Sequence, residues 1–212
     1  MRYLTIVGVL VMSMTSAHAS VLQAVEQGDI AKLTTAITAG NDIEERNSEG
    51  QTALLVATWQ NDIAAAEKLI AAGADVNAKD NISDSPYLVA GAQGRVEILK
   101  LALANGADLK SVNRFGGTAL IPAAEKGHPE AVRALLDAGV APDHVNRLGW
   151  TALMEAVVLT NGGPIFVEIV KTLLEAGADP NIPDNDGVTA LVHAKARGFN
   201  DMVALLEAHG GK

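Results

Sequence analysis

The chain has 212 residues, a formal net charge of −9 at pH 7 and no cysteine. Without cysteine it has no disulfide, no thiolate nucleophile and no thiolate metal ligand. An acidic chain without a basic run repels phosphate groups, so nucleic acid and anionic lipid headgroups are not expected as partners.

Residues 1–19 have the pattern of a secretory signal. Arg2 supplies a positive start, Leu4 to Met12 form a short apolar run, and Ala17-His18-Ala19 gives the small-x-small pattern that signal peptidase cleaves. The alternative is a transmembrane anchor, but the apolar run is about half of the ~20 residues that a spanning helix needs. We therefore predict a cleavable signal peptide and a mature chain that starts at Ser20. This chain is expected in the periplasm of a Gram-negative bacterium, not inserted in the membrane.

Residues 20–47 predict a helix, a break at Gly28-Asp29, a second helix and a stop at Ala39-Gly40. Glycine ends helices because it tolerates the left-handed conformation of a C-terminal cap. The segment has the helix pair of the units that follow it but lacks their opening phrase. We interpret it as an N-terminal capping unit.

A three-residue phrase then recurs along the chain. Its copies begin at residues 52, 85, 118, 151 and 189, so the steps are 33, 33, 33 and 38 residues. A fixed period of this size predicts one supersecondary unit stacked on copies of itself. The copies are Thr52-Ala53-Leu54, Ser85-Pro86-Tyr87, Thr118-Ala119-Leu120, Thr151-Ala152-Leu153 and Thr189-Ala190-Leu191, and the closing phrases include Ala72-Gly73-Ala74-Asp75, Asn105-Gly106-Ala107-Asp108 and Ala176-Gly177-Ala178-Asp179.

Residues 113–146 are the clearest unit. We expect the Thr118 hydroxyl to cap a short helix over 119–126, because threonine satisfies free backbone N–H groups at helix starts. A second helix over 130–138 has apolar residues at helical spacing. Each helix is too short to be stable alone, so stability must come from neighbouring units.

These phrases resemble the ankyrin repeat, whose consensus runs G-x-T-P-L-H-x-A-A, then Gly, then a second helix with L-L, then G-A-D-x-N. The matches are Gly50, Gly116, Gly149 and Gly187 two residues before Thr, and Leu135-Leu136, Leu173-Leu174 and Leu205-Leu206 in the second helix. The resemblance covers residues 20–212 and implies an all-α ankyrin-repeat solenoid of helix–turn–helix units with short hairpin-like loops. It divides the chain into a cap at 20–47, repeats at 48–80, 81–113, 114–146 and 147–184, and a cap at 185–212.

Two features depart from this pattern. The consensus His is replaced by an apolar residue in every copy, so its hydrogen bonds between repeats must give way to apolar contacts. The 38-residue step places an insertion at residues 160–164, in the turn between the two helices of one repeat. Such insertions often map to the binding face, and the alternative is a tolerated surface insertion, because added loop length costs little free energy.

The sequence has no catalytic or metal-binding pattern. Its histidines after the signal do not have the spacing of a ligand pair on one helix. The glycines follow the period of the repeat instead of forming a phosphate-binding loop, and no G-x-S-x-G elbow occurs. We therefore expect no enzyme activity, no cofactor and no metal. The histidines are His128, His144, His193 and His209.

The resemblance also implies where a partner would bind. In ankyrin-like repeats the loop before the Thr phrase and the end of the first helix face a concave groove. Aromatic and arginine side chains contribute much of the binding energy in protein interfaces. We predict that the partner-binding residues are Trp59, Arg114, Phe115, Arg147, Leu148, Trp150, Val158 and Leu159. The alternative for Trp59 and Trp150 is ordinary core packing between neighbouring repeats.

The expected function is therefore binding of another protein, by a monomer, through the concave face. Similar exported bacterial ankyrin-repeat proteins suggest support of an antioxidant enzyme such as a periplasmic catalase. They also suggest immunity against a toxin delivered by a rival cell, and regulation of an envelope complex is a further alternative. The acidic stretch 41–49 is a second surface that could meet a basic partner, although such a stretch is more often a solvated loop.

Overall fold

The computed structural model of the chain describes residues 19–212. The predicted signal peptide therefore lies, up to residue 18, outside the described residues. Within the described part there are twelve α-helices and no named strand, with an isolated bridge between Arg46 and Thr52. The helices are α1 (Val21–Glu26), α2 (Ile30–Thr38), α3 (Ala53–Gln60), α4 (Ile63–Ala71), α5 (Pro86–Ala92), α6 (Val96–Ala104), α7 (Leu120–Glu125), α8 (Pro129–Asp137), α9 (Ala152–Val158), α10 (Pro164–Glu175), α11 (Ala190–Arg197) and α12 (Asn200–Ala208).

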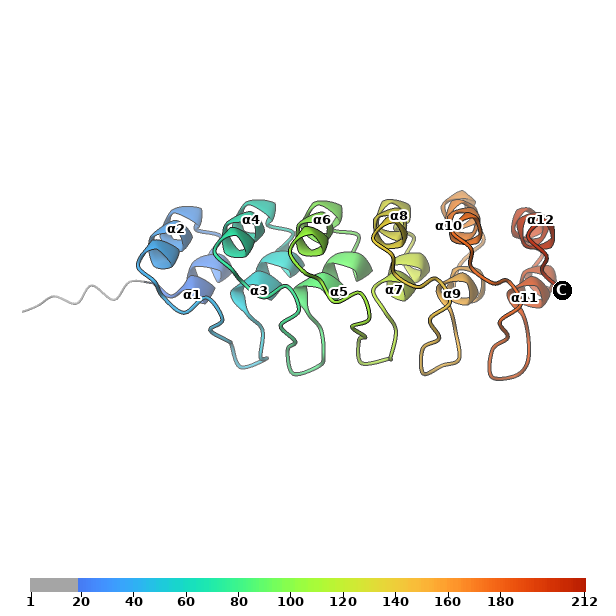
Figure 1. Cartoon of the computed structure of the whole chain (residues 1–212), viewed down its shortest axis with the longest axis horizontal. Helices are drawn as coiled ribbons and strands as arrows, with labels where there is room; N and C mark the ends of the chain where they lie inside the picture. Colours follow the sequence, from blue (N-terminus) through green and yellow to red (C-terminus); the bar gives the residue numbers. More distant parts are fainter. Residues whose placement is uncertain (1–18) are drawn as a thin grey trace, which may run out of the picture.

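The helices stack in two rows (Figure 1). The odd-numbered helices form the first row and the even-numbered helices form the second, with each helix packed against the next in its row. Each odd-numbered helix also packs against the even-numbered helix that follows it. The loops between one pair and the next project beyond the first row, on the side away from the second row. This arrangement confirms the predicted all-α solenoid.

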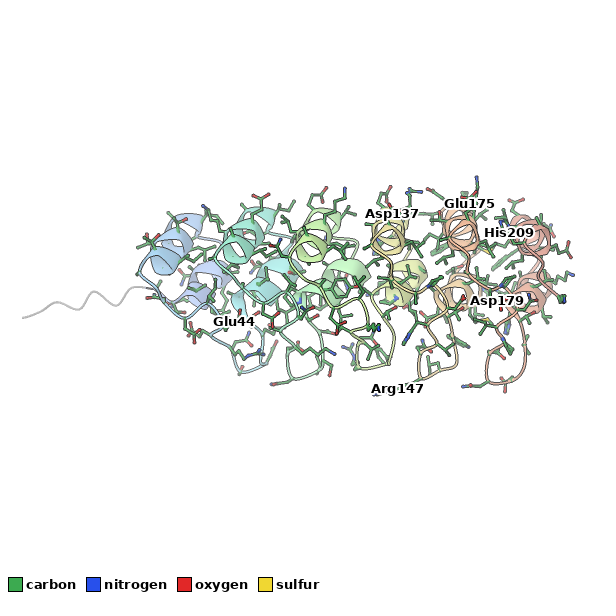
Figure 2. All side chains as sticks on the ribbon, in the orientation of Figure 1. Glu44, Asp137, Arg147, Glu175, Asp179 and His209 are labelled. Atoms are coloured by element: carbon green, nitrogen blue, oxygen red, sulfur yellow. The ribbon has the colours of Figure 1, made fainter. Side chains whose placement is uncertain are left out.

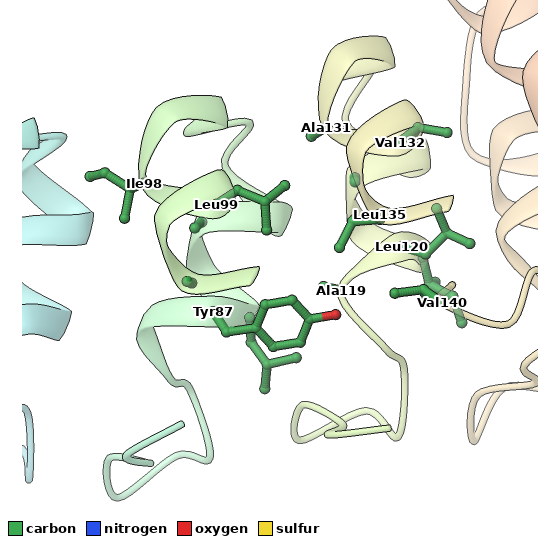
Figure 3. Close-up of a cluster of buried hydrophobic side chains, with 14 of the residues drawn as sticks. Tyr87, Ile98, Leu99, Ala119, Leu120, Ala131, Val132, Leu135 and Val140 are labelled. Carbon is green, nitrogen blue, oxygen red and sulfur yellow. The ribbon is translucent and has the colours of Figure 1, made fainter. Parts of the chain in front are cut away.

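A continuous hydrophobic core, built mainly from Ala, Leu and Val, runs between the two rows. Tyr87 on α5 is the largest fully buried side chain, and Figure 3 shows its ring extending toward α7, near Ala119. Full burial of one large apolar side chain is worth roughly 1.5–3 kcal/mol. Because each helix pair buries part of its apolar face only against its neighbours, the stack holds together as a chain of adjacent interfaces.

In three of the five copies of the phrase, the side-chain oxygen of the first residue caps the first-row helix that follows. Each oxygen accepts a hydrogen bond from the backbone N–H three residues later at 3.1–3.3 Å, and the capping residues are Thr52, Ser85 and Thr151. The predicted cap at Thr118 is wrong, because its buried hydroxyl has no hydrogen-bond partner and α7 begins only at Leu120. Nearby Pro122 has no N–H to donate. The Ile121 N–H lies 3.3 Å from the Thr118 carbonyl oxygen instead of being bound by the hydroxyl.

An asparagine or aspartate holds each loop between helix pairs in the same conformation. Its Oδ1 accepts hydrogen bonds from the backbone N–H groups two and four residues later, at 2.9–3.1 Å; these residues are Asn47, Asp80, Asn113, Asn146 and Asp184. Hydrogen bonds also join neighbouring loops. The backbone N–H of Arg147 donates to the Phe115 carbonyl oxygen at 3.0 Å, and Asn185 Nδ2 donates to the Leu148 carbonyl oxygen at 3.0 Å. The loops therefore form one ordered row.

The insertion at residues 160–164 changes both the turn and the second helix of its repeat. The prediction placed all five inserted residues in the turn, but Pro164 is the first residue of α10. Proline suits this position because its fixed φ fits a helix and its missing N–H would have no helical partner there. As a result α10 has 12 residues, whereas α8 has 9.

The C-terminal repeat covers this insertion. The Arg197 guanidinium donates hydrogen bonds to the carbonyl oxygens of Val158 and Thr160 at 2.9 and 2.6 Å. The Phe199 ring lies so close to Gly162 that a Cβ there would be 2.5 Å from the ring. The inserted turn is therefore packed against the rest of the stack.

Candidate functional site

Three large apolar side chains lie exposed at the same position of neighbouring loops. Ile82, Phe115 and Leu148 have exposed fractions of 52%, 54% and 53%. The backbone N–H of each is bound to the Asn or Asp two residues earlier, at 2.9 Å in each case. The backbone is thus fixed while the side chains face solvent. Neighbouring exposed apolar groups of this kind are candidate contact surfaces.

A cavity of about 370 Å³ adjoins the loop tips of Phe115 and Leu148. Residues of α3, α5, α7 and α9 and of the loop before α7 line it. Its walls are largely apolar, with Trp59 from α3, Leu88 from α5 and Ile121 from α7 among the lining residues. We call the three loop tips and the lining of this cavity the cavity face.

The structure brings five of the eight predicted binding residues together around this cavity. They come from α3, from the loops before α7 and α9, and from the end of α9, and they are Trp59, Arg114, Phe115, Leu148 and Leu159. Trp59 and Leu159 are 39% and 48% exposed, so they can contact both the cavity and an approaching partner. That these residues bind a partner stays a prediction.

The other three predicted residues do not line the cavity. Arg147 lies at the end of its loop, as Figure 2 shows, and its Nη1 donates to the Arg114 carbonyl oxygen at 2.8 Å. It therefore links two loops. Trp150 and Val158 are half-buried and pack against the hydrophobic core. For Trp150 this is the packing that the alternative interpretation expects.

Asp84 and Arg114 form an ion pair in the cavity wall, with 3.3 Å between Asp84 Oδ2 and Arg114 Nη1. The guanidinium carbon of Arg114 also lies 4.9 Å from the centroid of the Phe115 ring. Burial raises the pKa of Asp84 above its ordinary value, and the neighbouring Arg114 charge opposes this. The pair therefore holds the guanidinium beside the exposed ring, where a cation and an aromatic face attract each other.

Glu155 on α9 is the most deeply buried charged residue of the cavity lining, with an exposed fraction of 5%. Its Oε1 accepts a hydrogen bond from Asn146 Nδ2 at 2.7 Å. Burial, with a smaller contribution from the Glu125 carboxylate, raises the pKa of Glu155 to about 7. Burial acts in this direction because removing a carboxylate from water disfavours its charged form.

Sequence reasoning missed the other residues of the cavity face, among them Ile82, Glu125 and Glu155. The repeat register contains the signal for Ile82, because it precedes Phe115 and Leu148 by steps of 33 residues. For Glu155 the signal is a single acidic residue in a register position that is otherwise apolar in the preceding repeats. The earlier residues at that position are Val56, Val89 and Pro122.

The cavity face presents apolar area, a guanidinium that is already paired, and a buried carboxylate. In residues 19–212, no group of three or more His, Cys, Asp or Glu is placed to hold a metal ion. None of the helices in the described part is long and apolar enough to cross a membrane. Three of the four histidines have structural partners: His144 Nε2 lies 2.7 Å from the Gly116 carbonyl oxygen, His193 Nε2 lies 2.7 Å from Asp184 Oδ2, and His209 Nδ1 lies 2.9 Å from the Leu205 carbonyl oxygen.

Comparison with known families agrees with the repeat period. A profile described as "Ankyrin repeats (3 copies)" matches residues 87–184, and a profile described as "Ankyrin repeat" matches residues 49–81. A search of curated proteins found no match.

Solved structures similar to this one are ankyrin-repeat proteins. The crystal structure of an ankyrin repeat domain from Acinetobacter baumannii AYE is 55% identical, with a TM-score of 0.88, covering 91% of this chain and 98% of that chain. The ankyrin repeat protein EF0377 is 44% identical, with a TM-score of 0.87 and the same two coverages. The ankyrin repeat domain of Bcl-3, a member of the IkappaB protein family, is 27% identical, with a TM-score of 0.81, covering 91% and 86%. From the repeat period, the stacked helix pairs and these similarities, the chain belongs to the ankyrin-repeat family.

Proposed function

We propose that this protein binds a segment of another protein through its cavity face and catalyses no reaction on it. Ankyrin repeats generally mediate protein–protein interaction. The observation that carries the proposal is the row of exposed Ile82, Phe115 and Leu148 beside a largely apolar cavity. Apolar side chains grouped in this way gain free energy when a partner removes them from water.

The rigidity of the loops supports the same proposal. Association costs free energy when loops must become ordered, so a surface that is ordered beforehand binds more tightly. Here the Asn and Asp side chains and the hydrogen bonds between loops fix the backbone that carries the tips. The Arg114 guanidinium, held by Asp84, adds a polar group at the edge of the apolar area.

Site-specific photo-crosslinking tests this proposal. A benzophenone amino acid at position 115 should crosslink a partner protein in cells, whereas the same amino acid at position 97 should not. Glu97 is the matched control because it is exposed on α6 in the second row of helices. Equal crosslinking from both positions would overturn the assignment of the cavity face.

The crosslinked protein should then be identified, purified and titrated into the ankyrin-repeat protein by calorimetry. A Trp59→Ala, Phe115→Ala, Leu148→Ala variant should bind at least about tenfold more weakly, because a few central apolar residues carry most interface energy. A Glu97→Ala, Lys100→Ala variant on α6 is the control and should bind with unchanged affinity. A triple variant that keeps full affinity while remaining folded would contradict the proposal.

We further propose that the protein acts in the periplasm. The pattern of Arg2, the apolar run after it and Ala17-His18-Ala19 supports this. The identity of the crosslinked partner decides between the roles suggested by similar proteins. If the partner is a catalase, the protein supports an antioxidant enzyme; if it is a delivered toxin, the protein confers immunity. N-terminal sequencing of the protein from a periplasmic extract should begin at Ser20. An intact N-terminus in the cytoplasmic fraction would contradict export.

A further inference from the structure

Three carboxylates and two cations line the cavity, and one of these carboxylates forms an ion pair. Arg114 is bound to Asp84 at 3.3 Å, whereas among residues 19–212 no ion pair reaches Glu125 or Glu155. The charge that acts on Glu155 comes instead from another carboxylate, Glu125. The cavity therefore has a neutralised side at Asp84 and an uncompensated acidic side at Glu125 and Glu155.

Glu155 has a single hydrogen-bond partner in the protein. Its Oε1 accepts the hydrogen bond from Asn146, and among residues 19–212 no hydrogen bond or ion pair reaches its Oε2, which is not among the fully buried unpaired atoms and is therefore open to the cavity. The residue is 95% buried, and it lines the cavity. A buried carboxylate that lacks a cation is costly in free energy, and a cation that reaches it from outside recovers that cost.

The rest of the lining suits an alkyl chain. Leu148 and Leu159, which precede and follow α9, are apolar lining residues of the repeat that carries Glu155. Lysine and arginine side chains carry a long methylene stem that packs on apolar surface, with the charge at the end. A cavity of about 370 Å³ is large enough for one such side chain.

We propose that the cavity receives a lysine or arginine side chain of the bound partner, whose charged group pairs with Glu155 and Glu125 and whose stem contacts Leu148 and Leu159. This inference rests on the proposed function and specifies the partner's chemistry: a basic residue flanked by apolar residues that cover the loop tips. An acidic side chain would meet uncompensated carboxylates, and an apolar one would bury Glu155 without a partner. The overall charge of −9 favours approach of a basic segment.

Four short peptides that differ only in their central residue test the proposal. The centre is lysine, arginine, norleucine or glutamate, flanked on both sides by leucine, and each peptide is titrated into the ¹⁵N-labelled protein at a pH of about 8. The lysine and arginine peptides should bind at least about tenfold more tightly than the norleucine peptide, since hydrogen bonds between charged groups are the strong ones. Amide shifts should concentrate in α7, α9 and the loops before them. The glutamate peptide should bind most weakly.

Glu155→Gln keeps the shape of the side chain and its bond to Asn146, and it should reduce the preference for lysine over norleucine to about twofold or less. Glu97→Gln removes the same charge from α6 and should leave the preference intact, which separates a local effect from a change in net charge. If Glu155→Gln does not fold, Glu125→Gln serves as the second variant and should weaken the preference in the same direction.

The outcomes separate this inference from the proposed function. Equal binding of the norleucine and lysine peptides at the cavity face would overturn the inference and leave protein binding supported. A preference for lysine that survives both Glu155→Gln and Glu125→Gln would also overturn it. If no peptide changes the amide shifts of the cavity residues, the inference fails. The proposed function is then tested independently by the crosslinking experiment from position 115.

Discussion

Gly91 on α5 faces Ala119 so closely that a Cβ at position 91 would lie 2.8 Å from the Ala119 Cβ. The same Cβ would lie 3.4 Å from the Ala119 carbonyl oxygen. Neither atom belongs to a flexible side chain that could move away. The absence of a side chain at Gly91 is therefore what allows α5 to approach the start of α7.

Gly91→Ala is expected to lower the free energy of unfolding by roughly 1–3 kcal/mol, the usual cost of overpacking a core. This loss should outweigh the ~1 kcal/mol by which alanine is the better helix former. Urea unfolding followed by circular dichroism measures the difference. Equal or greater stability of the variant would show that α5 and α7 can separate at little cost.

Two substitutions of Tyr87 should affect stability differently. Its Oη is buried and has no hydrogen-bond partner, although the rest of the side chain fills the core between α5 and α7. Tyr87→Phe removes the unsatisfied group and should leave stability unchanged or raise it by up to roughly 1–3 kcal/mol. Tyr87→Leu introduces the residue found here in the other repeats but leaves a void, so it should destabilise by roughly 2 kcal/mol or more. A less stable Phe variant in urea unfolding would contradict this account.

The sequence predicted the stack of helix pairs because the period of 33 residues repeats both the helix signals and the apolar faces. The prediction failed at two helix starts, where the local residues differ from the repeat pattern. The Thr118 hydroxyl caps no N–H in the repeat where Pro122 lacks a helical N–H, and Pro164 begins α10 instead of belonging to the turn. Both differences lie beside a proline, whose effect depends on its exact position in the helix.

The candidate site was predicted in part. The ankyrin resemblance, applied to the repeat register, placed Trp59, Phe115 and Leu148 on one face, and the structure shows them around one cavity. Register does not say whether a side chain turns to the cavity or to the core, which is why Trp150 packs against the core instead. The environment of Glu155 depends on contacts between repeats, with Glu125 one repeat earlier, and such contacts follow only from the three-dimensional stack.

Glu155 should make stability depend on pH. Its pKa in the folded protein is about 7, above the ordinary value of 4.5, so the folded state holds a proton that the unfolded state releases. The stabilising contribution is therefore complete below about pH 4.5 and is lost as the pH rises through about 7. Compared with Glu155→Gln, the unaltered protein should lose roughly 1–3 kcal/mol between pH 4.5 and 8.

Urea unfolding of both proteins across this pH range gives the difference, and taking the difference cancels the titration of other groups. Glu97→Gln should show no such dependence relative to the unaltered protein, because Glu97 is exposed on α6. A constant difference between the unaltered protein and Glu155→Gln would mean that Glu155 titrates normally in the folded state.

Asn113 should be replaceable by aspartate but not by alanine. Its Oδ1 accepts hydrogen bonds from the backbone N–H groups of Phe115 and Gly117 at 2.9 and 3.1 Å, and Asp80 and Asp184 do the same in other loops. Asn113→Ala leaves these N–H groups without the acceptor and should cost roughly 1–2 kcal/mol of stability. Asn113→Asp keeps both bonds and should change stability by less than about 0.5 kcal/mol.

Hydrogen exchange at the Phe115 and Gly117 amides distinguishes a local effect from a global one. In Asn113→Ala these amides should exchange faster than those of the loop held by Asn146, whose hydrogen bonds are unchanged. Because the Phe115 ring is presented by this loop, the same variant should also bind the partner more weakly, whereas Asn113→Asp should bind with normal affinity. Uniformly faster exchange along the chain would instead indicate that Asn113 stabilises the whole stack and does not specifically order the tip that carries Phe115.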